Sequence, residues 1–155
     1  MGIVHADIDL LSGPDVIAAR EGRLAEDQIR RVHVESVVDT SAFMLSINEP
    51  IRAELGLPTV EQALVRLADG SRITVDVVGP VELRFANRRV NLDAVVMPGN
   101  AEVLLGANAL EHMDVLVDPL RQRLIVNPAH PDRPEFRMVG MRPNPVHPDV
   151  FSDMS

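Results

Sequence analysis

The stretch VVDTSA, residues 37–42, places an acidic side chain between two valines and three small residues. The residues before it, 32–38, alternate between apolar and polar and then become continuously apolar, which predicts a strand that ends in the core. A carboxylate at the end of a buried strand is costly unless it is paired or hydrogen-bonded. Thr40 could supply a hydroxyl, and small neighbours let backbone amides approach. Asp39 is therefore either an ordinary turn aspartate, a common use of this residue, or a functional carboxylate.

The rest of the chain reads as short strands separated by Gly, Pro, Asn and Asp turns. Two short helical pieces separated by Gly22 are expected within 15–31. A short helix with Asn48 as N-cap and Gly56 as its end follows, and another is expected at 107–112. Strand spacing of this kind predicts an all-β fold, a closed or partly open barrel with short helices. The expected strands are 2–11, 32–38, 60–67, 71–78, 81–85, 89–97, 102–106, 114–118 and 123–127.

Composition narrows the possible partners. A chain of 155 residues is the size of one domain, and its net charge of −8 disfavours a phosphate backbone as partner. The absence of Trp and Tyr removes the usual base-stacking groups. For these two reasons we do not expect nucleic acid as a partner. No apolar run approaches the length of a membrane span, so we do not expect a membrane as a partner either. The absence of cysteine excludes disulfides and thiolate sites, and fits a cytoplasmic location.

Other chemistries find little support. The five histidines are scattered without ligand spacing, so we expect no metal and no cofactor. No G-x-S-x-G element is present for a serine nucleophile. The arginine pairs at 30–31 and 88–89 are interpreted as solvated surface. Six of the twelve prolines fall between Pro128 and Pro148, which predicts one domain over 1–135 followed by a flexible tail over 136–155.

Two motifs together resemble the retropepsin-like aspartic proteases, in particular bacterial single-domain members. Residues 38–42, VDTSA, resemble the D-[ST]-G-[AS] motif, and residues 104–110, LLGANAL, resemble the second signature, an apolar pair followed by glycine and a short helix. Residues 69–71 occupy a position comparable to the family's flap. Residues 114–127 are similar to the closing strands of the bacterial members. The resemblance implies the acid-protease barrel and a homodimer.

The resemblance also implies roles for particular residues. Hydrolysis of a peptide bond by carboxylates needs one group as base and another as acid. Only Asp39 carries the motif, because Asp114 and Asp118 lack the small residues that should follow, so the second carboxylate must come from a second copy of the chain. The implied site comprises catalytic Asp39; motif and dimer-contact residues Thr40, Ser41 and Ala42; flap and substrate-binding residues Ala68, Asp69 and Gly70; and support beneath the catalytic loop from Leu104, Leu105 and Gly106.

Two departures from the family pattern leave a second function open. Ser41 stands where the family usually has glycine, and Ala107 where retroviral members often have an arginine that helps to lock the dimer. The main hypothesis is an aspartic endopeptidase acting on a peptide or protein substrate. The alternative is a non-catalytic module of the same fold that binds peptides or other proteins. A third possibility is a β domain in which both motif matches are accidental.

Overall fold

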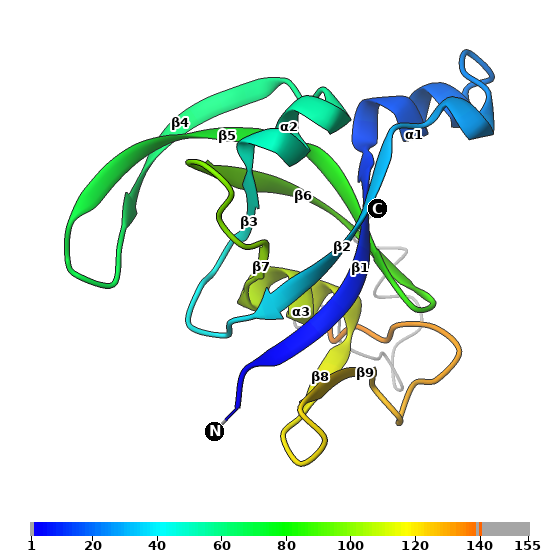
Figure 1. Ribbon diagram of the computed structural model, residues 1–155. Helices are drawn as coiled ribbons and strands as arrows, with labels where there is room; N and C mark the ends of the chain where they lie inside the picture. The colour runs from blue at the N-terminus through cyan, green and yellow to red at the C-terminus, as the bar shows by residue number, and fades with distance from the viewer. Residues whose placement is uncertain (1, 139, 141–155) are drawn as a thin grey trace, which may run out of the picture.

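The computed structural model describes residues 2–138 and 140 (Figure 1). These residues form a mainly β structure with short helices, none of which is long and apolar enough to cross a membrane. The elements are β1 (Val4–Ser12), α1 (Gly13–Arg20), the 3-10 turn η1 (Glu26–Gln28), β2 (Arg31–Val38), β3 (Leu45–Asn48), α2 (Glu49–Leu55), β4 (Thr59–Arg66), β5 (Arg72–Phe85), β6 (Arg88–Met97), β7 (Leu104–Leu105), α3 (Ala107–Met113), β8 (Val115–Asp118) and β9 (Arg123–Val126).

The strands form a closed barrel with two extensions. Their order in the sheet is β4-β5-β6-β3-β7-β2-β1-β9-β8, and an additional antiparallel pairing between β1 and β5 closes the ring β1-β2-β7-β3-β6-β5. Apolar side chains that alternate along each strand fill the ring, including Ile8, Leu10, Leu45, Leu83 and Leu105. The expected β-barrel with short helices is confirmed, and it is closed rather than partly open.

The outer part of β4 and β5, residues 59–78, forms a hairpin that projects from the barrel, to the left in Figure 1. We call it the projecting hairpin. A second, smaller apolar cluster lies along it and includes Val65, Val75, Val77 and Val95. These residues bring one side of the projecting hairpin against β6, so the hairpin overhangs the edge of the barrel near the end of β2.

Local signals located most elements correctly, and two of the predicted strand assignments were wrong. Residues 71–78 and 81–85 belong to one strand, because the register shifts between Val78 and Val81 and leaves Pro80, which has no N–H to donate, at the interruption in the ladder. The two short helical pieces expected within 15–31 are present as α1 and the 3-10 helix η1, and Gly22 lies between them. The strand expected at 102–106 contains only Leu104 and Leu105, because the following residues begin α3.

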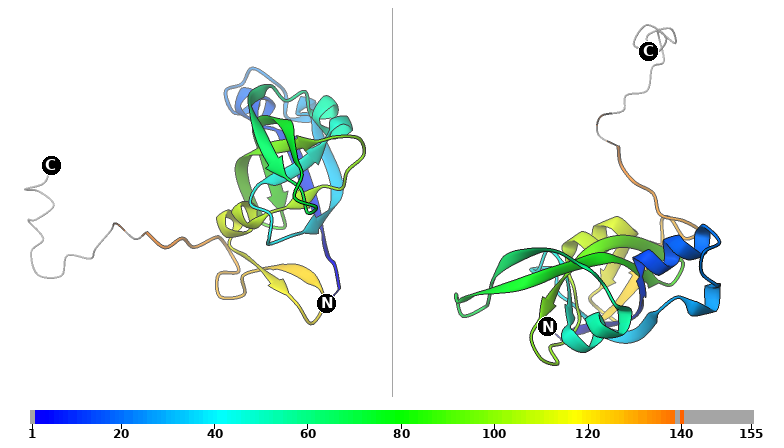
Figure 2. Two further views of the ribbon diagram at one scale, coloured as in Figure 1. Left: turned by 90° about the vertical axis from the view of Figure 1, so that its left-hand side faces the viewer. Right: turned by 90° about the horizontal axis from the view of Figure 1, so that it is seen from above.

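The segment after β9 is bound to the barrel by a polar network. The carboxylate of Asp114 accepts hydrogen bonds from Asn127 Nδ2 at 3.0 Å and the backbone N–H of Glu135 at 3.0 Å, and lies 2.7 Å from His130 Nδ1. Arg88, expected at the surface, is buried and donates to the carbonyl of His130. Residues 136–138 run away from the barrel (Figure 2), and most of the predicted tail lies outside the described residues.

Candidate active site

Asp39 follows the last residue of β2, and the loop 39–44 leads from there into β3. Strand β7 lies between these two strands, parallel to β2 through the pairs Val37–Leu104 and Val38–Leu105, and antiparallel to β3. The N–H of Asp39 donates to the carbonyl of Leu105 at 2.9 Å. The two motifs, more than sixty residues apart in the chain, are therefore neighbours, and the second motif fixes the backbone at Asp39.

Gly106 allows the loop 39–44 to close onto α3. The N–H groups of Ala107 and Asn108 donate to the carbonyls of Ala42 and Phe43 at 2.8 and 3.0 Å. A Cβ atom at position 106 would lie 2.5 Å from the Phe43 carbonyl oxygen, closer than real Cβ contacts allow. The glycine is thus required by a close approach of two backbones. Leu104, Leu105 and Gly106 therefore lie against the end of β2 and the loop 39–44, and their role in supporting catalysis stays a prediction.

The carboxylate of Asp39 is held by donors from its own loop. The N–H of Ser41 donates to Oδ1 at 3.0 Å, and the Ser41 hydroxyl donates to the same oxygen. The Ser41 hydroxyl, then its N–H, and also the N–H of Ala42 hold the pKa of Asp39 below its usual range, against a smaller opposing effect of burial. The hydroxyl comes from Ser41, whereas the sequence suggested Thr40. Asp39 is itself half-buried, and β2 ends against the core, because the half-buried Val38 packs against the main apolar cluster.

An apolar pocket of about 590 Å³ opens on one side of Asp39, between the loop 39–44 and the projecting hairpin. Of the predicted site residues, Ser41, Ala42, Ala68 and Leu104 line it together with Asp39. Asp69 and Gly70 do not line it; they form the exposed turn of the hairpin, where Gly70 has a φ of 87°. The arm of the hairpin therefore lines this pocket and its turn does not, and the flap role expected for Asp69 and Gly70 stays a prediction.

Sequence reasoning missed the other walls of this pocket. Phe43 and Met44 follow the motif directly, while Val95 and Met97 come from β6. The apolar run after residue 42 was visible in the sequence, but nothing in it indicated that β6 would lie beside the motif. The lining is therefore largely apolar, with Asp39 and Arg66 as its charged residues, and suits an extended chain with apolar side chains.

A second pocket, of about 420 Å³, lies on the other side of Asp39. The N-terminal residues 2–4, the end of β2, and the turn between β8 and β9 line it, and Thr40 is one of its walls. Among the described residues, neither pocket beside Asp39 is lined by another carboxylate, and no group of three His, Cys, Asp or Glu side chains could hold a metal ion. Asp114 and Asp118 are engaged by hydrogen bonds of their own.

A comparison with family models identifies the chain independently. A model described as gag-polyprotein putative aspartyl protease matches residues 25–112, more than half of the chain. The matched residues include Asp39, the projecting hairpin and Gly106. A search of curated proteins found no match. On the family match, and in agreement with the geometry of the two motifs, this chain belongs to the gag-polyprotein aspartyl protease family, whose domain is retropepsin-like.

Proposed function

We propose that this protein is an aspartic endopeptidase in which two Asp39 carboxylates, one from each subunit of a homodimer, hydrolyse a peptide bond. The observation that carries the proposal is the place of Asp39, partly exposed and backed by the second motif, beside an apolar pocket that the projecting hairpin overhangs. Family membership supports the same chemistry. A carboxylate acting alone could not serve as base and acid at the same time.

The proposed chemistry requires one shared proton. Two carboxylates about 3 Å apart cannot both ionise, so one Asp39 is ionised and the other protonated. The ionised carboxylate takes a proton from a water molecule, whose oxygen attacks the peptide carbonyl carbon, while the protonated carboxyl donates its proton to the carbonyl oxygen. Collapse of the tetrahedral intermediate breaks the C–N bond as the nitrogen receives a proton. No cofactor is required.

Substrate binding would use the apolar pocket and the projecting hairpin. Val65 and Leu67 on the hairpin arm, and Met44 and Met97 opposite, provide surfaces for apolar side chains. An extended peptide between the hairpin and the loop 39–44 would add main-chain hydrogen bonds, as an added strand does. Ser41 and Ala42 would line the floor, and Thr40 would contact the partner subunit across the axis.

Mixing wild type with Asp39→Asn tests both the residue and the dimer. Asparagine is isosteric but cannot exchange the required proton, so the pure variant should be inactive while remaining folded. In an equal mixture at fixed total protein, about a quarter of randomly formed dimers keep two carboxylates, whereas a monomeric enzyme would keep about half of its activity. Cleavage of an unfolded protein substrate provides the readout. Undiminished hydrolysis by the pure variant would overturn the proposal.

The alternative, a peptide-binding module without catalysis, is motivated by Ser41. Its side chain occupies a position where glycine would leave room for a substrate backbone, and its hydroxyl occupies one oxygen of Asp39. In that case both wild type and Asp39→Asn should bind an apolar peptide, measured by fluorescence anisotropy, and neither should cleave it.

A further inference from the structure

One buried carboxylate on β5 holds three arginines. Glu82 is fully buried, and Nε and Nη2 of Arg84 each lie 2.7 Å from its Oε2. Arg20, the last residue of α1, and Arg89 on β6 lie 3.3 and 3.4 Å from its Oε1. We call these three arginines the guanidinium cluster. A buried carboxylate needs a charged partner to offset its lost hydration, and Arg84 alone provides one.

The guanidinium cluster carries more positive charge than Glu82 neutralises, in a chain whose net charge is −8. Arg84 and Arg89 stand directly opposite each other in the β5–β6 ladder, where like charges are destabilising. Each guanidinium has five N–H donors in a fixed fork. Among the described residues, the side-chain hydrogen bonds of these arginines all go to Glu82. Arg20 and Arg89 are more than half exposed, so donors that Glu82 does not engage are accessible to a further anion.

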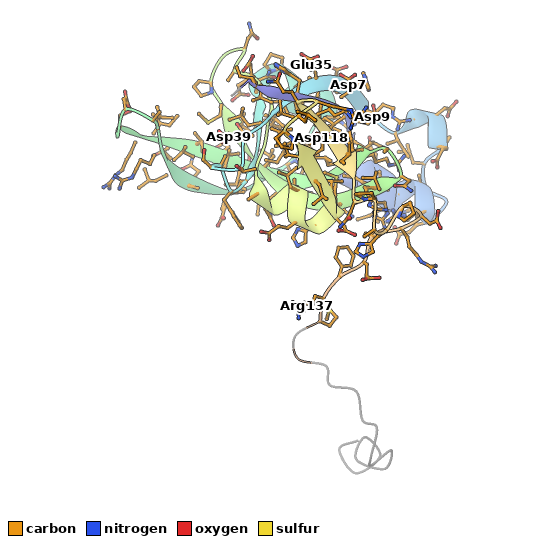
Figure 3. All side chains as sticks on the ribbon, turned by 90° about the horizontal axis from the view of Figure 1, so that it is seen from below. Asp7, Asp9, Glu35, Asp39, Asp118 and Arg137 are labelled. Atoms are coloured by element: carbon orange, nitrogen blue, oxygen red, sulfur yellow. The ribbon has the colours of Figure 1, made fainter. Side chains whose placement is uncertain are left out.

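Acidic side chains near the guanidinium cluster already have partners or lie towards β2. Asp9 is directly opposite Arg84 in the β1–β5 ladder, and its carboxylate lies 2.9 Å from an imidazole on β2. Glu21, next to α1, forms an ion pair with Arg23. Arg89 lies on β6, one strand further from β1 than Arg84. Two more carboxylates follow Asp9 along β1 and β2 in Figure 3, those of Asp7 and Glu35. An anion is therefore favoured on the β6 side of the cluster.

We propose that the guanidinium cluster binds an acidic segment of another protein, whose carboxylates pair with Arg20 and Arg89. The planar fork of arginine matches a carboxylate with two parallel hydrogen bonds. The three arginines come from α1, β5 and β6, so each presents its own fork, which suits several carboxylates along an extended segment better than one small ion.

The guanidinium cluster is separate from the candidate active site. In Figure 3, Asp9, which neighbours the cluster, lies on the side of the barrel towards α1, whereas Asp39 lies towards the projecting hairpin. A protein held at the cluster therefore leaves the pocket beside Asp39 open. The inference goes beyond the proposed function and does not depend on it.

The test measures the binding of an acidic peptide by fluorescence anisotropy. The probe is a labelled peptide in which Glu alternates with Ser, and its counterpart carries Gln in place of Glu. Arg20→Gln combined with Arg89→Gln removes two forks and leaves Arg84 on the buried Glu82. We expect the wild type to bind the Glu peptide more tightly than the Gln peptide. Because exposed ion pairs are individually weak, the paired substitution should raise the Kd of the Glu peptide by about fivefold.

Arg121→Gln combined with Arg123→Gln is the matched control. Both arginines are exposed, both lie within reach of one carboxylate, that of Asp118, at 3.3 and 3.9 Å, and their removal changes the net charge by the same amount. This control and Asp39→Asn should bind the Glu peptide as the wild type does. Circular dichroism establishes folding. If the paired variant does not fold, Arg89→Gln alone should give a smaller loss in the same direction.

The outcomes are independent of whether the protein cleaves peptides. A wild type that binds both peptides equally overturns the inference, as does a folded paired variant that binds the Glu peptide as tightly as the matched control. Loss of binding in Asp39→Asn would place the peptide at the active site and also overturn it. Inorganic phosphate should displace the Glu peptide little more than chloride of equal ionic strength does. Displacement by low-millimolar phosphate would indicate a site for a single oxyanion and contradict an acidic segment as the ligand.

Discussion

Removing the hydroxyl at position 41 should raise the pKa of Asp39. The Ser41 hydroxyl and N–H both donate to Oδ1 of Asp39, and together with the N–H of Ala42 they favour the ionised carboxylate. Ser41→Ala deletes the hydroxyl and retains both N–H donors. Because a higher pKa makes the ionised member of the pair harder to form, activity should be lost at a higher pH as the solution is acidified.

The size of the change follows from the bond that is lost. A hydrogen bond to a charged group contributes roughly 1.5–3 kcal/mol, and a shift of one pKa unit corresponds to about 1.4 kcal/mol. Asp39 is partly exposed, so water replaces some of the lost stabilisation and the lower end of the range applies. The acid limb of the profile of kcat/KM against pH should therefore move up by about one unit.

A closely matched control exists elsewhere in the chain. Ser71 donates through its N–H and its hydroxyl to Oδ1 of Asp69, in the same local arrangement, at the exposed turn of the projecting hairpin. Ser71→Ala should leave the acid limb in place, and Ser41→Thr, which keeps a hydroxyl, should restore most of the wild-type profile. The reasoning is refuted if Ser41→Ala leaves the limb unmoved, or if Ser71→Ala moves it equally.

Two further substitutions probe the support of the site. Gly106→Ala sets a Cβ atom against the Phe43 carbonyl and should destabilise the protein by about 1–3 kcal/mol and reduce cleavage. Gly140→Ala, where an added Cβ atom meets nothing, should change neither stability nor cleavage. Urea unfolding measures the stability of both variants. Asp114→Asn should lower the Tm at neutral pH. Hydrogen bonds from the N–H of Glu135 and from Asn127 lower the pKa of Asp114 to about 2, so its stabilising contribution is complete above the unfolded value near 4 and is lost as the pH falls through 2. The Tm deficit should therefore shrink toward pH 2, and a deficit independent of pH, or one equal to that of Asp132→Asn, would contradict this role.

Local sequence signals were sufficient for the elements that depend on local interactions. Asn48 caps α2 by accepting the N–H of Ile51 at 3.0 Å, and Gly56, with a φ of 60°, ends that helix as expected. Gly79-Pro80 resembled a turn in every local respect. It lies within β5 because pairings with distant strands on both sides outweigh the local preference.

In the candidate site, too, some residues could be predicted from the local sequence and others could not. Gly106 could be predicted because two backbones approach too closely there for a Cβ atom, and Asp39 because it stands in a recognisable motif of small residues after a strand. The pocket walls on β6 could not, since their position follows from the parallel pairing of β3 with β6. Arg88 was misinterpreted for a related reason. A buried arginine requires partners that satisfy its donors, and its partner carbonyl, that of His130, lies forty-two residues away in the chain.

Assembly and protonation are linked in the proposed dimer. In one subunit, the donors from Ser41 and Ala42 favour an ionised Asp39. A second ionised carboxylate about 3 Å away would repel it strongly, so bringing two subunits together requires the uptake of one proton. The loop that favours the ionised form of Asp39 in a single subunit therefore opposes formation of the proposed dimer near neutral pH. A lower pH favours the dimer. Apolar contacts between the subunits, whose strength does not depend on pH, would therefore have to supply the attraction that holds the proposed dimer together near neutral pH.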